Sequence, residues 1–128
     1  KNGGVMVIAP EGTRSKTASL LKAEPGAIYI ASTAGVGIIP VALTGTEDAE
    51  VIARLKKFQK LKITITAGDE MYFPPDIKSV KGMERDVLLQ ASMDEVMCRI
   101  AGMLPERYRG YYKDFPRTRE LSPLYRTD

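Results

Sequence analysis

Apolar and polar residues succeed one another along the chain in blocks that predict a strand, a loop and a helix. Val5–Ile8 is a continuous apolar run, and it predicts a buried parallel strand that ends at Pro10. The polar residues 11–24 predict a loop. Apolar residues with helical spacing follow Pro25, and they predict a helix that stops at Gly35.

A second apolar run completes a strand–helix–strand pattern. Residues 38–43 predict another buried strand, in which Pro40 indicates an edge position or a local irregularity. Residues 5–43 therefore predict a βαβ unit with a right-handed crossover. We expect an α/β fold with a mixed, mostly parallel sheet and flanking helices.

The rest of the chain predicts one more strand, a helix and a tail. Residues 44–60 predict a loop that contains a short helix, and strict alternation over 62–67 predicts a half-buried strand. Ser92 and Glu95 have the spacing of a capping box, which predicts a helix that begins there and stops at Pro105. A separate turn or helix is expected before it, near residues 84–89. The residues beyond Pro105 are rich in Arg, Tyr and Pro, and they predict an irregular, partly mobile tail.

Composition limits the chemistry that the chain can perform. Its 128 residues suffice for one compact domain, and no stretch approaches the ~20 apolar residues that span a bilayer. The chain contains no histidine, which excludes a histidine base or metal ligand within it. Cys98 is the single cysteine; its apolar helical surroundings predict a buried structural thiol, and a reducing compartment is the default.

The charge is mildly basic, with a net charge of +3 and an isoelectric point near 9.0. This is far from the dense basic patch of a nucleic-acid binder, so no nucleic-acid partner is expected. The basic residues gather at Arg54, Lys56, Lys57, Lys60 and Lys62, and again from Arg107 onward. One interpretation is a solvated face; the other is attraction to an anionic membrane surface, at about 1 kcal/mol per basic residue.

The polar residues 11–15 are the main candidate for a binding site, because they follow a predicted strand at the sheet edge where ligands of open α/β sheets bind. Gly12 lets the backbone approach a ligand closely, and Thr13 and Ser15 offer hydroxyl groups. Arg14 offers a permanently charged fork that suits two phosphate oxygens.

Three charged neighbours complete this candidate site. Lys16 and Lys22 add positive charge nearby. Glu11 would orient Arg14 or a backbone amide, because a carboxylate that faces a phosphate is repelled by it. The alternative interpretation is an ordinary surface turn with a Glu–Arg ion pair, worth roughly 0–1 kcal/mol.

These residues resemble the PlsC-like family of lysophosphatidic acid (glycerolipid) acyltransferases. Pro10-Glu11-Gly12-Thr13-Arg14-Ser15 is similar to the third conserved block of the family, and residues 37–43 are similar to the fourth. Residues 22–27 resemble a lengthened form of a Lys-x-Gly-Ala stretch, and 104–112 resemble the tail of family members. Ala9 departs from the pattern, since the family usually has Phe there.

The resemblance implies a 1-acylglycerol-3-phosphate O-acyltransferase-like protein of phospholipid biosynthesis. Such an enzyme transfers an acyl group from a thioester donor, acyl-CoA or acyl carrier protein, to a lysophospholipid or glycerol-phosphate acceptor; no bound cofactor or metal is implied. Arg14, with Gly12 and Thr13, would bind the acceptor phosphate, and Glu11 would support the loop. The implied substrate-binding residues are Glu11, Gly12, Thr13, Arg14, Ser15 and Lys22, of which Lys22 is the weaker candidate.

The family's catalytic pair is not found in this chain. In family members a histidine acts as general base and an aspartate orients it, in a block that precedes the Glu-Gly-Thr-Arg loop. The resemblance therefore implies no catalytic residue here, and we expect the chain alone to be inactive. Residues 1–104 are expected to be the C-terminal part of an acyltransferase domain, and 105–128 its Arg/Tyr/Pro-rich tail.

Two further expectations follow from a partial domain. Uncovered strand edges and apolar faces would favour self-association. The expected location is the cytoplasm or the cytoplasmic face of a membrane, with no transmembrane segment in this chain. The alternative function is a non-catalytic module that binds anionic lipid or phosphate.

Overall fold

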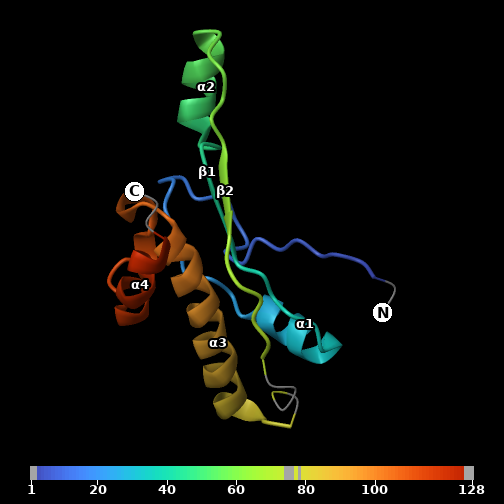
Figure 1. The fold of residues 1–128 in the computed structure, drawn as a ribbon. Helices are drawn as coiled ribbons and strands as arrows, with labels where there is room; N and C mark the ends of the chain where they lie inside the picture. Colours follow the sequence, from blue (N-terminus) through green and yellow to red (C-terminus); the bar gives the residue numbers. More distant parts are fainter. Residues whose placement is uncertain (1–2, 74–76, 78, 126–128) are drawn as a thin grey trace.

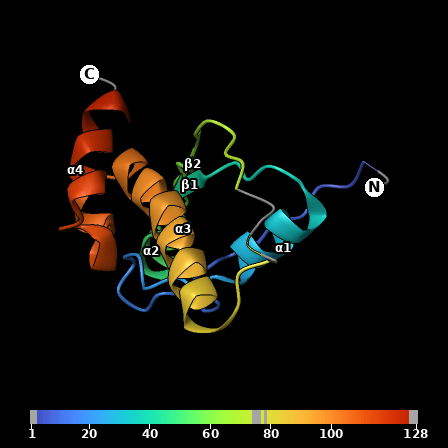
Figure 2. The ribbon, with the colours of Figure 1, turned by 90° about the horizontal axis from the view of Figure 1, so that it is seen from below.

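The long helix α3 (Gly82–Met103) is the element against which most of the chain packs. The computed structural model describes residues 3–73, 77 and 79–125. Figures 1 and 2 show α3 lying between α1 (Gly26–Ala34) and the C-terminal helix α4 (Pro116–Leu121). The buried core lies along α3, and α1 and α4 contribute Ile28 and Leu121 to it.

The sheet is a two-stranded antiparallel ribbon. β1 (Val41–Thr44) pairs with β2 (Thr64–Ala67), and Val41 lies opposite Ala67. An antiparallel bridge between Ile38 and Met71 extends this pairing past Pro40. The chain between the strands holds a short helix, as expected for 44–60; this is α2 (Asp48–Lys56), which projects beyond the ribbon in Figure 1.

The predicted strand at Val5–Ile8 is wrong. Val5 and Val7 are each 93% exposed, and no strand of the described residues pairs with this segment. A continuous apolar run indicates a preference for burial, but a strand also needs a neighbouring backbone to accept its hydrogen bonds. The βαβ unit and the mostly parallel sheet are therefore wrong as well, and the mixed α/β character rests on helices beside an antiparallel ribbon.

The first helix has the bounds that its local signals predict. α1 begins directly after Pro25 and ends at Ala34. Gly35 adopts a left-handed conformation, with φ of 63°, and its N–H donates to the carbonyl of Ser32. Glycine favours this position because it has no Cβ to clash with the turn.

The start predicted for the last long helix is wrong, although its end is confirmed. α3 begins at Gly82, so Ser92 lies inside the helix instead of capping it. The buried stripe already includes Leu89 and continues through Met93, so the packing against α3 extends the helix through the capping-box signal. Helix α3 ends at Met103, and the next residue is extended, as the position before Pro105 requires.

The predicted irregular tail is also wrong. Residues 105–125 form the 3₁₀ turns η2 (Glu106–Tyr108), η3 (Gly110–Tyr112) and η4 (Ser122–Tyr125) around α4. Tyr112 and Leu121 belong to the buried core. The composition is typical of a mobile segment, but buried apolar residues recur often enough to hold it on α3. Residues 126–128 lie outside the described part, and the domain division at residue 104 stays a prediction.

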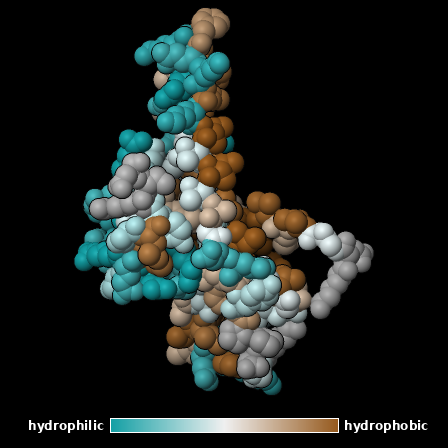
Figure 3. Space-filling view, viewed as in Figure 1, coloured by the Kyte–Doolittle hydropathy of each residue, from teal (hydrophilic) through white to brown (hydrophobic). Residues whose placement is uncertain are grey.

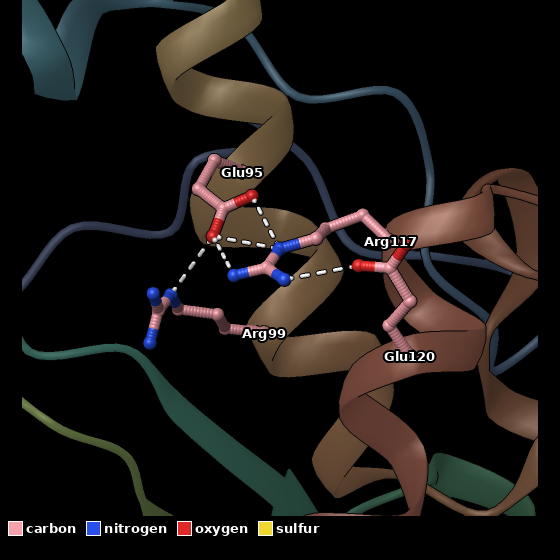
Figure 4. A network of polar contacts seen from close by, with 4 residues as sticks. All are labelled: Glu95, Arg99, Arg117 and Glu120. Carbon is pink, nitrogen blue, oxygen red and sulfur yellow. Dashed lines mark hydrogen bonds and ion pairs between the residues drawn. The ribbon is translucent and has the colours of Figure 1, made fainter.

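An ion-pair network fastens this C-terminal segment to α3. The carboxylate of Glu95 accepts hydrogen bonds from Arg117, with Nε 3.0 Å from Oε2, and from Arg99 on its own helix. Arg117 also reaches Glu120 at 3.0 Å (Figure 4). One carboxylate therefore joins two helices, and the second arginine keeps it in place.

Buried polar contacts hold the chain before α1 against α3. The Tyr112 hydroxyl accepts a hydrogen bond from the Ala23 amide at 3.0 Å and donates to Asp94 Oδ1 at 3.2 Å. Gln90 Nε2 donates to the Ala23 carbonyl and to Asp94. We call these four residues the Tyr112 clamp. Cys98 is buried in the same core, as predicted; burial raises the pKa of its thiol, so it stays protonated at neutral pH.

One face of the ribbon is apolar and exposed. Leu43 and Ile65 lie opposite each other in the register, and both side chains are at least half exposed. Figure 3 shows hydrophobic side chains in a column along the two strands. Large uncovered apolar surfaces commonly mark interaction sites, and the expected self-association stays a prediction.

We predict that Tyr112→Phe lowers the free energy of unfolding by about 1–3 kcal/mol, because the Ala23 amide and the Asp94 carboxylate lose a buried partner. Urea denaturation followed by circular dichroism measures the change. Tyr111→Phe is the matched control: its ring packs on Tyr112 and Phe115 but is half exposed, and the variant should shift stability by less than about 0.5 kcal/mol. Equal losses in the two variants would contradict the role of the clamp.

Candidate functional site

A tight turn and a returning segment position the 11–15 loop. The Gly12 amide donates to the Ala9 carbonyl at 3.1 Å, and Gly12 has a φ of 67°, which glycine adopts without strain. Glu11 Oε2 accepts a hydrogen bond from the Leu21 amide at 2.7 Å. Of the two roles expected for Glu11, the structure has the second: it orients a backbone amide, and the loop is tied to the chain that leads into α1.

Ser15 shapes the second half of the loop. Its Oγ accepts hydrogen bonds from the amide of Thr17 at 3.3 Å and from the amide of Ser19 at 3.2 Å. The Thr17 and Ser19 hydroxyls lie 2.8 Å apart and extend this small network. The Ser15 hydroxyl is therefore engaged in folding the loop, and Thr13 is exposed.

Arg14 lies at the surface, and among the described residues it has one weak ion-pair partner. Its Nη1 is 3.7 Å from Oδ1 of Asp48, the first residue of α2, and the two side chains are 88% and 75% exposed. Exposed ion pairs of this kind contribute roughly 0–1 kcal/mol. The guanidinium is therefore accessible to another anion, although that anion must displace Asp48.

An open cleft of about 660 Å³ adjoins Arg14. Of the predicted site residues, the structure brings Glu11, Arg14 and Ser15 to its lining, and Lys16 joins them. Gly12, Thr13 and Lys22 are not lining residues. Sequence reasoning missed the other main contributors. Leu20 lies close by in the sequence, whereas the rest come from distant parts of the chain: Leu43, Glu47, Asp48, Leu104 and Tyr108.

Glu47 and Tyr108 bring charge and an aromatic ring to the cleft. A hydrogen bond from the Tyr108 hydroxyl lowers the pKa of the Glu47 carboxyl below its ordinary value. Arg107 Nη2 donates to the Tyr108 hydroxyl oxygen at 2.7 Å, and its guanidinium lies 4.6 Å from the centre of the ring. The only sequence signal for Tyr108 is its place in the family-like stretch 104–112.

The cleft therefore combines an accessible cation with carboxylates and an apolar lining. Arg14 and Lys16 supply positive charge, whereas Glu11, Glu47 and Asp48 supply negative charge. Within the described ranges, no three His, Cys, Asp or Glu residues are grouped so that they could hold a metal ion. The three carboxylates of the lining outnumber its two cations, so an anion in the cleft would have to contact Arg14 and Lys16 directly.

The comparisons with known proteins bear on the first third of the chain. Residues 1–44 match the sequence model of the Acyltransferase family. Over 44 residues the chain is 51% identical to a 1-acyl-sn-glycerol-3-phosphate acyltransferase of Cocos nucifera, a stretch that covers 34% of this chain and 14% of that relative. No solved structure matches the chain. The matched residues include the 11–15 loop and Pro40.

We predict that Glu11→Ala speeds hydrogen exchange at the Leu21 amide by about tenfold, because the amide loses its carboxylate acceptor; a hydrogen bond to a charged group is worth about 1.5–3 kcal/mol. Amide exchange followed by NMR measures this site directly. Glu11→Gln is the matched control, since its carbonyl can still accept the bond and should retain most of the protection. Unchanged exchange in the alanine variant would refute the contact.

Proposed function

We propose that the 11–15 loop, which lies within the stretch that matches the Acyltransferase family, holds the phosphate of a glycerol-phosphate acceptor. The protein would act as a 1-acylglycerol-3-phosphate O-acyltransferase of phospholipid biosynthesis. The observation that carries the proposal is the exposed guanidinium of Arg14, which lies in the matched segment and lines the cleft.

The cleft suits an acceptor with two chemically different ends. A phosphate at Arg14 and Lys16 would displace Asp48 and accept charge-assisted hydrogen bonds. The remainder of a lysophospholipid would then lie against Leu20 and Leu43, where apolar surface can be buried. Glycerol phosphate alone would use the polar end only, so the same loop serves either acceptor. Lys22 stays a weaker candidate, because it lies outside the cleft lining.

The acyl donor and the chemistry itself belong to the same proposal. The donor would be a thioester, acyl-CoA or acyl carrier protein, and no bound cofactor is invoked. A histidine general base would have to deprotonate the acceptor hydroxyl, and this chain has no histidine. The chain would therefore bind the acceptor without catalysing transfer, at the cytoplasmic face of a membrane or in the cytoplasm.

A second candidate function is a non-catalytic module that binds anionic lipid or phosphate. The basic residues that follow Arg54 favour it, since they lie on the part of the chain that projects from the body. The two candidates use different residues: the acceptor site uses Arg14, whereas the lipid-binding module uses Lys56, Lys57 and Lys60. Binding to anionic lipid that survives loss of the Arg14 charge but disappears when these lysines are neutralised would favour the module.

We predict that glycerol 3-phosphate binds weakly at Arg14, and that Arg14→Gln weakens binding by about tenfold, as expected for the loss of a charge-assisted hydrogen bond. Asp48→Asn should strengthen binding up to about fivefold, because it removes the competing carboxylate. ¹⁵N chemical-shift titration at low ionic strength measures both constants.

Lys81→Gln, at the start of α3, removes one positive charge away from the cleft and is the control for a general charge effect. Glycerol without phosphate is the control ligand and should not bind. Equal affinities of the wild type and Arg14→Gln would overturn the assignment of the phosphate to this loop.

We further predict that the 128-residue chain forms no phosphatidic acid from acyl-CoA and lysophosphatidic acid, because no histidine is present to act as base. Product detection by mass spectrometry after long incubation is the measurement. Turnover above the rate in buffer would contradict the requirement for a histidine base, but it would not contradict phosphate binding at Arg14.

A further inference from the structure

An arm formed by residues 45–63 stands apart from the packed body of the protein. It consists of α2 and the segment that returns from it to β2, and Figure 1 shows it extending beyond the ribbon, away from α1, α3 and α4. No residue of α2 is buried. The arm is therefore a projecting element whose side chains contribute little to the core.

The tip of the arm carries an aromatic residue where glycine is favoured. The Phe58 amide donates to the Leu55 carbonyl and the Gln59 amide to the Arg54 carbonyl, a pair of bonds that defines a Schellman motif. Phe58 occupies its left-handed position, with φ of 51°, and its side chain is 99% exposed. The turn needs no side chain here, and the fold makes no use of the ring.

The charges of the arm are segregated along its length. Acidic residues occur only at its root, up to Glu50, whereas residues 51–63 contain five basic residues and no acidic one. Arg54 is held by Glu50 and by the Lys60 carbonyl. The other four basic side chains have no ion-pair partner among the described residues: Lys56, Lys57, Lys60 and Lys62.

Apolar side chains accompany these lysines. Ile52 and Leu55 are three positions apart, hence on one side of α2, and both are more than half exposed. Leu61 and Ile63 are exposed on the returning segment. In Figure 3 the hydrophobic column of the ribbon continues toward the tip, beside the hydrophilic side of α2. The arm thus presents an aromatic tip, an apolar side and a basic fringe.

We propose that this arm docks on an anionic phospholipid bilayer, with Phe58 and Leu55 entering the interfacial region and the unpaired lysines binding lipid phosphates. Segments that bind at the surface of anionic membranes typically combine exposed apolar side chains with basic residues, as this arm does. The arm rests on the surface: no helix within the described ranges has both the length and the apolar character to cross a membrane. The inference is independent of phosphate binding at Arg14.

Charge decides between this occupant and a second copy of the chain. Two arms packed tip to tip would bring the same four lysines together, with no acidic residue between positions 51 and 63 to offset them. An anionic bilayer instead offers a complementary charge to every lysine and an apolar layer to the ring. The bilayer is therefore the partner that fits both features.

Vesicle sedimentation of the full chain tests the proposal. We expect binding to vesicles of phosphatidylcholine that contain phosphatidylglycerol, binding at least about tenfold weaker to phosphatidylcholine alone, and a loss of affinity as salt is raised. Phe58→Gly should weaken partitioning by about tenfold or more, because it removes the inserted ring. Glycine suits the left-handed position, so this variant keeps the turn and the fold.

Matched control variants distinguish the contribution of the arm from a general effect of charge or of exposed apolar surface. Lys57→Gln should weaken binding several-fold, whereas Lys81→Gln outside the arm should not change it. Leu124→Ala removes another exposed apolar side chain, which lies on η4, and should also leave binding unchanged. Equal binding by the wild type and Phe58→Gly, or equal binding to the two kinds of vesicle, would overturn the proposal.

The insertion of the arm tip into the bilayer can be followed by tryptophan fluorescence, because the chain contains no tryptophan of its own. Phe58→Trp therefore places a single indole at the tip of the arm. We expect its emission to shift to shorter wavelength when phosphatidylglycerol vesicles are added, and to stay unshifted with protein concentration alone. A shift that appears on self-association without vesicles would instead assign the arm to a protein–protein contact and reject the bilayer.

Discussion

The Tyr112 hydroxyl is the contact on which the position of the candidate site depends. It joins the Ala23 amide to Asp94 of α3. Three residues before Ala23, the Leu20 amide donates to the Tyr108 carbonyl, and the Leu20 carbonyl accepts from the Tyr111 amide. Because Glu11 is bonded to the amide that follows Leu20, the 11–15 loop inherits its place from this anchored segment. The C-terminal residues, far away in sequence, therefore set where Arg14 lies.

Gly110 explains why this arrangement needs a particular sequence. Its φ is 45°, and a Cβ at this position would lie 2.1 Å from the Leu20 carbonyl oxygen. A side chain here would push away the segment that carries the loop. The stretch 104–112, which sequence reasoning associates with the family only by resemblance, thus has a physical role: it packs backbone against backbone beneath the candidate site.

The parts of the fold that could be predicted are those encoded within a few residues. Pro25 and Gly35 bound α1 as expected, since a proline start and a left-handed stop are local devices. Pairing and burial are not local. Val5–Ile8 has the composition of a strand but no partner among the described residues, and residues 105–125 have the composition of a tail yet find a surface on α3. Composition gives the preference, and the distant partner decides the outcome.

The same distinction applies to the site, where it links the two proposals. Residue types alone identified Arg14, but Asp48 could not be predicted, because it comes from the root of the arm. Asp48 is the first residue of α2, so an anion that binds Arg14 would also break the ion pair between Arg14 and this helix. Under the two proposals, the cleft lies at the root of the arm that would dock on the bilayer, so a lysophospholipid acceptor would reach it from the lipid surface. Such an arrangement would limit the exposure of the acceptor's apolar portion to water, which is costly.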